Sequence, residues 1–219
     1  MMNSEEKRAE RIEYARVIGN VISQNRPVIY VDETTFRGQS VQKKSWSTRN
    51  DHNFHYMTGP HFGTTVYGAV GDCIKNKFVY RLEPKSTNEV DYLKFLKENL
   101  LPAIQGGGPR NKPICIFDQH KAHLTDEVMK KLSHYVIPLP QVSYSSNFNS
   151  IETLWQLTKQ RYYKRRLLDQ DQLSKADFLE RVQAALNDIK PATIKSVLNA
   201  NRAYIRHYLM AGNQSAAEG

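Results

Sequence analysis

The order in which strand-like and helix-like segments follow one another limits the folds open to this chain. Three segments rich in apolar and β-branched residues come first, with no helix pattern between them, at 27–31, 64–72 and 77–84. Such a run of strands predicts an antiparallel meander. Later segments alternate between the two patterns: helix at 88–104, strand at 113–117, helix at 125–133 and strand at 135–140. Other helix patterns occupy 5–23, 149–167, 174–189 and 191–209.

These segments predict an α/β fold in which helices flank a mixed five-stranded sheet. The same element order occurs in ribonuclease H-like domains, so we expect that fold with a helical C-terminal extension. Three regions follow from this: an N-terminal helix that leads into the domain, the ribonuclease H-like core, and C-terminal helices with a short tail, at 1–26, 27–168 and 169–219.

Composition excludes several classes of protein. Hydrophobic residues make up 40% of the chain and charged residues 24%, which is ordinary for a globular protein and not for a disordered one. No apolar run approaches the roughly 18 residues of a membrane span, and the charged N-terminus is unlike a signal peptide, so we expect neither a membrane partner nor secretion. Cys73 and Cys115 form no CxxC pair, which indicates reduced thiols.

The formal net charge of +9 favours a polyanionic partner such as nucleic acid. The charge is concentrated in two stretches where basic residues alternate with aromatic ones, an arrangement that suits phosphates and bases together. We take as candidate DNA contacts Lys43, Lys44, Trp46 and Arg49 in the first stretch, and Lys159, Arg161, Lys164, Arg165 and Arg166 in the second. A charged hairpin and a solvated helix face remain open as alternatives for the two stretches.

Three carboxylates stand at the ends of predicted elements. Asp32 comes where the first strand is expected to end, Asp118 directly follows the strand at 113–117, and Glu152 falls near the first turn of the helix at 149–167. Two of them have a plain structural alternative. Asp118 is also suited to a turn or a helix cap, and Glu152 to the positive end of a helix dipole.

Considered together, the three carboxylates predict a metal site. We expect them to converge at one edge of the sheet, where without cations they would repel one another and their pKa values would rise. Magnesium prefers oxygen ligands, and pairs of such ions bind the attacking and leaving oxygens in phosphodiester chemistry. Asp32, Asp118 and Glu152 are therefore candidate ligands for magnesium or manganese, with two ions in the site.

Four sequence blocks, in order, carry a resemblance to a known family. They are "VIYVDETTF", "GTTVYGAVG", "CIFDQHKAH" and "SYSSNFNSIETLW". They resemble successive blocks of the DDE catalytic domain of mariner-superfamily transposases and of related bacterial insertion-sequence transposases. The last block is similar to that family's SPDLNPIExxW signature, and "KSWSTRN" to its Trp segment after the first strand. The resemblance spans roughly residues 7–168.

The resemblance implies a function and a set of roles. By position, Asp32, Asp118 and Glu152 match the catalytic, metal-binding trio, and His123 and Asn149 match residues that support it or are simply buried. Glu33 follows the first aspartate, as in the family, and is not implied as a ligand. The implied activity is metal-dependent DNA cleavage and strand transfer in cut-and-paste transposition at TA targets. The implied partners are element ends and target DNA, with a homodimer as the active form.

The chain departs from the family pattern in two ways. Gln119 replaces an asparagine, Asn147 an aspartate, and Ser146 and Ser150 two prolines. Loss of each proline makes the loop before Glu152 less rigid and costs up to about 1 kcal/mol of stability, because the unfolded chain gains conformational entropy. The family also carries a bipartite helix-turn-helix region before the catalytic domain, whereas about 26 residues precede the first strand here. We expect a catalytic half whose DNA recognition comes from a separate domain or protein.

Two alternative functions remain open. One is a domesticated or truncated remnant that binds DNA without cutting it, and the other is a stand-alone ribonuclease H-like nuclease. In each case the substrate sets the compartment, which is the nucleus in a eukaryote and the cytoplasm or nucleoid in a bacterium. The basic run at 159–166 is also suited to nuclear import.

Overall fold

The computed structural model of the chain describes residues 5–38, 62–83, 88–106, 111–143, 145–166 and 174–217. The predicted meander and the two later strands form one five-stranded sheet in the order β3-β2-β1-β4-β5. β1 pairs with β2, and β2 with β3, in antiparallel fashion, while β4 lies parallel to both β1 and β5. The predicted mixed sheet is therefore confirmed, with strands β1 (Val28–Arg37), β2 (Gly63–Gly71), β3 (Phe78–Glu83), β4 (Ile114–Phe117) and β5 (Ile137–Pro140).

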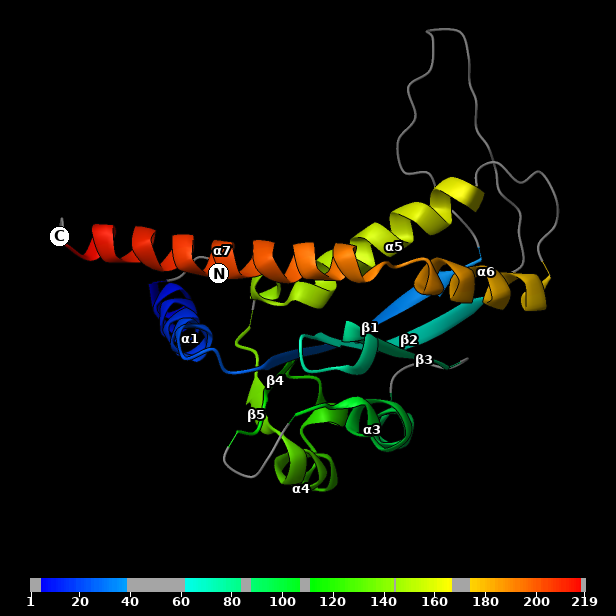
Figure 1. Ribbon diagram of the computed structural model, residues 1–219, viewed down its shortest axis with the longest axis horizontal. Coiled ribbons are helices and arrows are strands. Elements are labelled where there is room, and N and C mark those ends of the chain that lie inside the picture. The colour runs from blue at the N-terminus through cyan, green and yellow to red at the C-terminus, as the bar shows by residue number, and fades with distance from the viewer. Residues whose placement is uncertain are drawn as a thin grey trace, which may run out of the picture.

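Helices cover both faces of this sheet (Figure 1). On one face lie α1 (Glu5–Ser23), α5 (Ser150–Arg166), α6 (Lys175–Asn187) and α7 (Pro191–Ala217). On the other lie α2 (Glu89–Phe95), a π-helical turn (Leu96–Leu100), α3 (Leu101–Ala103) and α4 (Asp126–Tyr135). The helix predicted at 88–104 thus contains a π turn that ends two residues before Pro102, a residue without the N–H that a regular α-helix needs.

The side chains of β1 alternate between two hydrophobic cores. Val28 and Tyr30 belong to the core shared with α1, α5, α6 and α7, whereas Ile29 and Val31 belong to the core shared with α2, α3 and α4. This alternation is the period of two that a pleated strand imposes. It continues to the next two residues, so Asp32 is directed to the α5 face and Glu33 to the α2 face.

The prediction that the first strand ends near Asp32 is wrong. β1 continues to Arg37, because β2 pairs with it over its whole length, from Ile29 opposite Gly71 to Arg37 opposite Gly63. Backbone pairing with β2 satisfies the peptide groups whatever the side chains are, so a polar run continues the strand. On its other side β1 pairs with β4 only from Val28 to Tyr30. Asp32 is therefore in the middle of β1, just past the part that β4 covers.

The C-terminal helix is longer than its sequence pattern indicates. We expected it to end near residue 209, but α7 continues to Ala217 and has 27 residues. Across the described part of the chain, no helix combines the length and the apolar character needed to cross a membrane.

Candidate active site

A glycine on β2 lets α5 approach β1 closely. Gly68 pairs with Asp32 across the β1–β2 ladder. A Cβ atom at Gly68 would lie 2.6 Å from Cζ2 of Trp155 and 3.2 Å from Cδ1 of Ile151, so this position has no room for a side chain. Because Glu152 follows Ile151 in the first turn of α5, this packing brings Glu152 to the middle of β1.

The parallel pairing of β1 and β4 places Asp118 near Asp32. Ile116 lies opposite Tyr30, and β4 ends one residue later at Phe117. Asp118 is thus the first residue after β4, at the position where β1 loses its neighbour. It does not cap α4, since Thr125 does so by accepting a hydrogen bond from the backbone N–H of Val128.

Asp32 lies in a strongly acidic environment. Burial, followed by repulsion from Glu152, Glu33 and Asp118, raises its pKa to about 8. Burial also raises the pKa of Glu152, as does Asp118, while the positive charge of Lys159 acts in the opposite direction. The structure therefore brings Asp32, Asp118 and Glu152 within electrostatic range of one another. A cation would relieve this repulsion, and the three donors are the carboxylate oxygens that magnesium and manganese accept.

Asp118, in contrast, has a direct cationic partner in His123. The Nδ1 atom of this histidine lies 2.6 Å from Oδ1 of Asp118, and its Nε2 atom lies 3.2 Å from Oε2 of Glu33. The second contact has the distance of an ion pair without the alignment of a hydrogen bond. Burial acts to lower the pKa of His123, but the contacts with Asp118 and Glu33 outweigh it and raise the pKa to about 9. His123 is thus an imidazolium held between two carboxylates.

This histidine is also fixed by packing. Its side chain is 1% exposed, and its ring centroid lies 4.1 Å from that of Tyr92. Burial would raise the pKa of Asp118, but the hydrogen bond with His123 more than compensates and lowers it. Asp118 therefore stays ionised in a fixed position.

Glu33 is the residue that the sequence did not assign to the site. Within the described ranges, the group of possible metal-binding side chains whose ligand atoms lie within 4.8 Å of one another consists of Glu33, His120 and His123, and not of the three predicted carboxylates. The alternation of β1 was the available signal, because it directs Glu33 to the face that carries His123. The imidazolium of His123 accounts for the position of Glu33 without a metal ion.

The family model described as a DDE superfamily endonuclease matches residues 27–174, which is more than half of the chain. The chain belongs to this family. No curated protein sequence matches it significantly. The family match includes all three carboxylates, His123 and Asn149.

Solved structures show the same fold for this DDE endonuclease chain. The crystal structure of the mariner Mos1 paired end complex with Mg aligns with a TM-score of 0.71 at 15% identity, over 96% of this chain and 64% of that chain. The corresponding complex with Mn gives 0.68 at 12% identity, over 95% and 63%. The catalytic domain of Mos1 mariner transposase gives 0.64 at 13% identity, over 95% and 94%. The predicted ribonuclease H-like fold is confirmed, and the chain spans less than two thirds of the Mos1 chains in the complexes.

In this DDE endonuclease, α7 holds the loop that leads to Glu152. The Nδ2 group of Asn201 donates to the backbone oxygen of Asn147 at 3.1 Å, and the hydroxyl of Tyr30 lies 3.1 Å from Oδ1 of Asn201. Asn149 is 3% exposed, and its backbone oxygen accepts from the N–H of Glu152 at 3.2 Å. Asn201 thus supplies support to a loop whose family prolines are replaced by Ser146 and Ser150.

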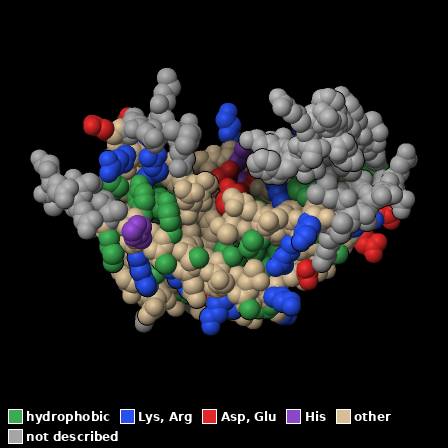
Figure 2. Space-filling model, turned by 90° about the horizontal axis from the view of Figure 1, so that it is seen from above, with side chains coloured by type: hydrophobic (Ala, Val, Ile, Leu, Met, Phe, Trp, Pro, Cys, Tyr) green, Lys and Arg blue, Asp and Glu red, His purple; other side chains and the backbone are tan. Residues whose placement is uncertain are grey.

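The basic residues predicted to contact DNA are only partly placed. Lys43, Lys44, Trp46 and Arg49 lie outside the described residues, as do the side chains of Arg165 and Arg166. Lys159 is on α5 with its Nζ atom 5.9 Å from the ring centre of Phe36, and burial lowers its pKa although the charge of Glu152 acts to raise it. Arg161 donates to the backbone oxygen of Asp188 at 3.3 Å. Lys164 is on the following turn of α5. Viewed from the side of α7, acidic side chains gather beside a histidine near the middle of the molecule (Figure 2).

Proposed function

We propose that this chain is the catalytic domain of a DNA transposase, which cleaves DNA strands and joins them to target DNA with the help of divalent cations. The observation that carries the proposal is the acidic environment of Asp32, where burial and then repulsion from Glu152, Glu33 and Asp118 raise its pKa to about 8, within a chain of net charge +9. An acidic centre in a basic protein suits metal-assisted chemistry on a polyanion.

The donor set fits magnesium or manganese. Asp32, Asp118 and Glu152 would hold the metal, with two ions as our proposal for the full site. Bound there, such cations would supply Lewis acidity toward the scissile phosphate.

The remaining residues of the site orient these ligands. His123 fixes Asp118 through its 2.6 Å contact and is itself held by Glu33 and by the ring of Tyr92. Asn149 braces the start of α5, where its backbone oxygen accepts from the N–H of Glu152. Lys159, on the same helix as Glu152, adds positive charge beside the acidic cluster and is placed to attract a DNA phosphate.

The partners follow from the same reasoning. The substrate would be DNA, both element ends and target, and two copies of the chain would process two ends together. The Mos1 relatives were solved as a pre-cleavage transpososome, as paired end complexes and as a strand transfer complex. We further propose that a separate domain or protein recognises the element ends, and that the chain acts where that DNA is, in the nucleus or in the bacterial cytoplasm.

The test is cleavage and joining of supercoiled plasmid in the presence of magnesium or manganese. The wild-type chain is compared with Asp118→Asn and Glu152→Gln, and with Glu180→Gln as a matched control on an exposed part of α6. We expect metal-dependent nicking and joining that both site variants lose and the control keeps. Release of short products without joining would instead indicate a nuclease. Binding without cutting, even with a DNA-recognition domain added, would indicate a remnant.

A further inference from the structure

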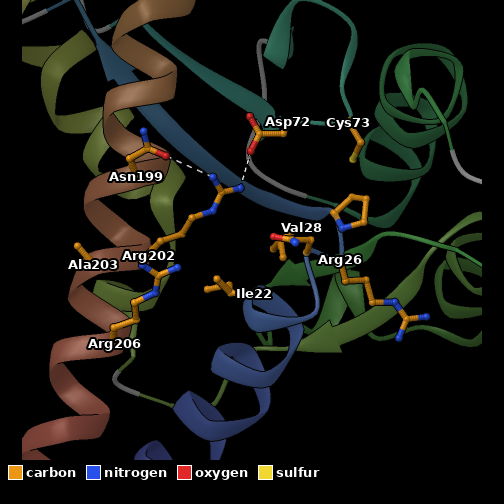
Figure 3. A pocket seen from close by; sticks show the side chains of 11 residues that line it. Ile22, Arg26, Val28, Asp72, Cys73, Asn199, Arg202, Ala203 and Arg206 are labelled. Atoms are coloured by element: carbon orange, nitrogen blue, oxygen red, sulfur yellow. Dashed lines mark hydrogen bonds and ion pairs between the residues drawn. The ribbon is translucent and has the colours of Figure 1, made fainter.

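A second basic site lies away from the three carboxylates, at the start of β1. A cavity of about 610 Å³ opens where the end of α1, the start of β1, the β2–β3 turn and α7 meet. Figure 3 shows its walls, with Arg202 and Arg206 on α7 and Arg26 and Cys73 across from them. Its volume falls in the range of about 300–1,000 Å³ that is typical of ligand sites.

One arginine of this cavity is held in place by the protein. Arg202 forms an ion pair with Asp72 and donates to Oδ1 of Asn199 at 3.3 Å. The other oxygen of the Asp72 carboxylate accepts from Lys77 at 2.9 Å. Asp72 is therefore fully paired, while the guanidinium of Arg202 is fixed at the wall of the cavity and keeps further N–H groups to donate.

The neighbouring arginine lacks such a partner. Arg206 is one helical turn after Arg202 and reaches toward the same space (Figure 3). Within the described part of the chain, no hydrogen bond or ion pair engages the side chain of Arg206 or of Arg26. Asp72 is the single carboxylate in the cavity lining, and it is already engaged. The cavity thus carries an excess of positive charge on arginines, whose forked guanidinium groups match the oxygens of a phosphate.

We propose that this cavity binds a backbone phosphate of DNA outside the catalytic centre. The inference rests on the proposed function, because that function makes DNA the polyanion that this chain meets. Val28 in the cavity wall and Asp32 in the acidic cluster are four residues apart on β1, about 13 Å. A bound duplex covers that distance in about four base pairs, so one DNA molecule can contact both.

Cys73 provides a direct reporter of occupancy. It is a half-buried free thiol in the cavity wall, and the other cysteine of the chain, Cys115, is fully buried. The experiment measures the rate at which a maleimide alkylates Cys73 in the whole chain, with EDTA present to prevent cleavage. A short DNA duplex and inorganic phosphate are added in separate titrations. We expect DNA near saturation to slow the alkylation several-fold, and phosphate to do so only at far higher concentration.

Matched variants make the test specific. Arg206→Ala is expected to weaken the protection of Cys73 and to reduce the slope of log K for DNA against log salt by about 0.9, the value for one lost phosphate contact. Lys94→Ala removes one exposed positive charge from α2, on the other face of the sheet, and is expected to leave the protection of Cys73 unchanged.

Three results would overturn the inference. The first is alkylation of Cys73 at the same rate with and without bound DNA, and the second is equal protection in Arg206→Ala and the wild type. The third is protection by phosphate at lower concentration than by DNA, which would assign the cavity to a small anion. Failure of the proposed function would be seen differently, as a chain that neither shifts nor cuts DNA, so the two failures remain distinguishable.

Discussion

The β4 side and the β1 side of the candidate site present the same chemical group in contrasting environments. On the β4 side, Asp118 has an imidazolium 2.6 Å away, and its pKa is lowered. On the β1 side, Asp32 is buried among other carboxylates, and its pKa is raised to about 8. Both side chains are predicted metal ligands on adjacent strands, so the difference comes from their neighbours and not from their own chemistry.

The two sides of the candidate site are held together in different ways. The protein itself fixes Asp118, through His123, Glu33 and Tyr92, before any cation arrives. Asp32 and Glu152 are brought together by packing through the space over Gly68, and they repel each other when both are ionised. We therefore expect the β4 side to be preorganised and the β1 side to depend on a bound cation for its ionised form.

The largest expected effect comes from removing a ligand on the β1 side. Asp32→Asn should reduce metal-dependent strand cleavage by about 10³-fold or more, since several kcal/mol of transition-state stabilisation depend on the metal. Plasmid nicking at a series of magnesium concentrations measures this, with Glu180→Gln as the control. Activity within tenfold of the wild type would remove Asp32 from the ligand set.

The next effect concerns the support on the β4 side. His123→Ala should lower cleavage by about 10- to 100-fold, the usual cost of losing a group that orients a metal ligand. Because Asp118 itself remains, raising the metal concentration should recover part of the activity, which it cannot do for Asp32→Asn. The same loss without any change in metal dependence would mean that His123 is only a packing residue.

A smaller effect should follow from moving α5 away from β1. Gly68→Ala places a methyl group against Trp155 and Ile151, which should cost about 1–3 kcal/mol of unfolding free energy by overpacking. Gly63→Ala is the matched control on the same strand, because among the described residues its Cβ would meet only the backbone oxygen of Phe36, at 3.6 Å. Urea unfolding of both variants measures the difference. Equal stabilities would show that α5 is not tightly seated over Gly68.

The last effect is a pH dependence of stability in EDTA that differs between the two sides. The folded chain keeps the Asp32 proton up to a pKa of about 8, whereas the unfolded chain loses it near 3.8, so this contribution to stability falls as pH rises through that window. His123 acts with the same sign between 6.5 and about 9. Asp118, with its lowered pKa, contributes stability that is lost only as pH falls below its ordinary value of 3.8.

The two sides can be separated in this measurement. Asp32→Asn should flatten the decline between about pH 4 and pH 8 and leave the acid limb in place. Asp118→Asn should flatten the acid limb and leave the decline between about pH 4 and pH 8 in place. Urea unfolding midpoints from pH 3 to 9 measure both effects. If stability still declines with rising pH to the same extent in Asp32→Asn, a group other than Asp32 causes the decline.

The sequence was sufficient for the element order because each element carries its own local pattern. The length of β1 escaped prediction, since Asp32, Glu33, Thr34 and Thr35 form a polar run typical of a turn. Their strand conformation depends on pairing with β2, which begins at Gly63 and is therefore separated from β1 by a long stretch of chain. Local composition carries no record of such a partner.

In the candidate site, too, residues with a local sequence signal could be singled out, whereas their supporting contacts could not. Asp118 could be identified because it directly follows a short buried strand, and Glu152 because it begins a helix. The contacts that support them depend on distant residues. Asn201 bonds to the hydroxyl of Tyr30 across 171 positions in the chain, and the role of Glu33 depends on His123 folding back against β1. Only the assembled sheet brings these groups together.

The bridge made by Asn201 has a consequence for the minimal fragment that can work. The family match stops at residue 174, so a chain cut there would retain every predicted ligand. It would lose α7, and with it the amide that joins Tyr30 to the loop at Asn147 and the buried side chains of Ile194, Leu198 and Ile205. We expect such a fragment to contain all the predicted catalytic side chains and yet to be unable to hold Glu152 in position beside β1.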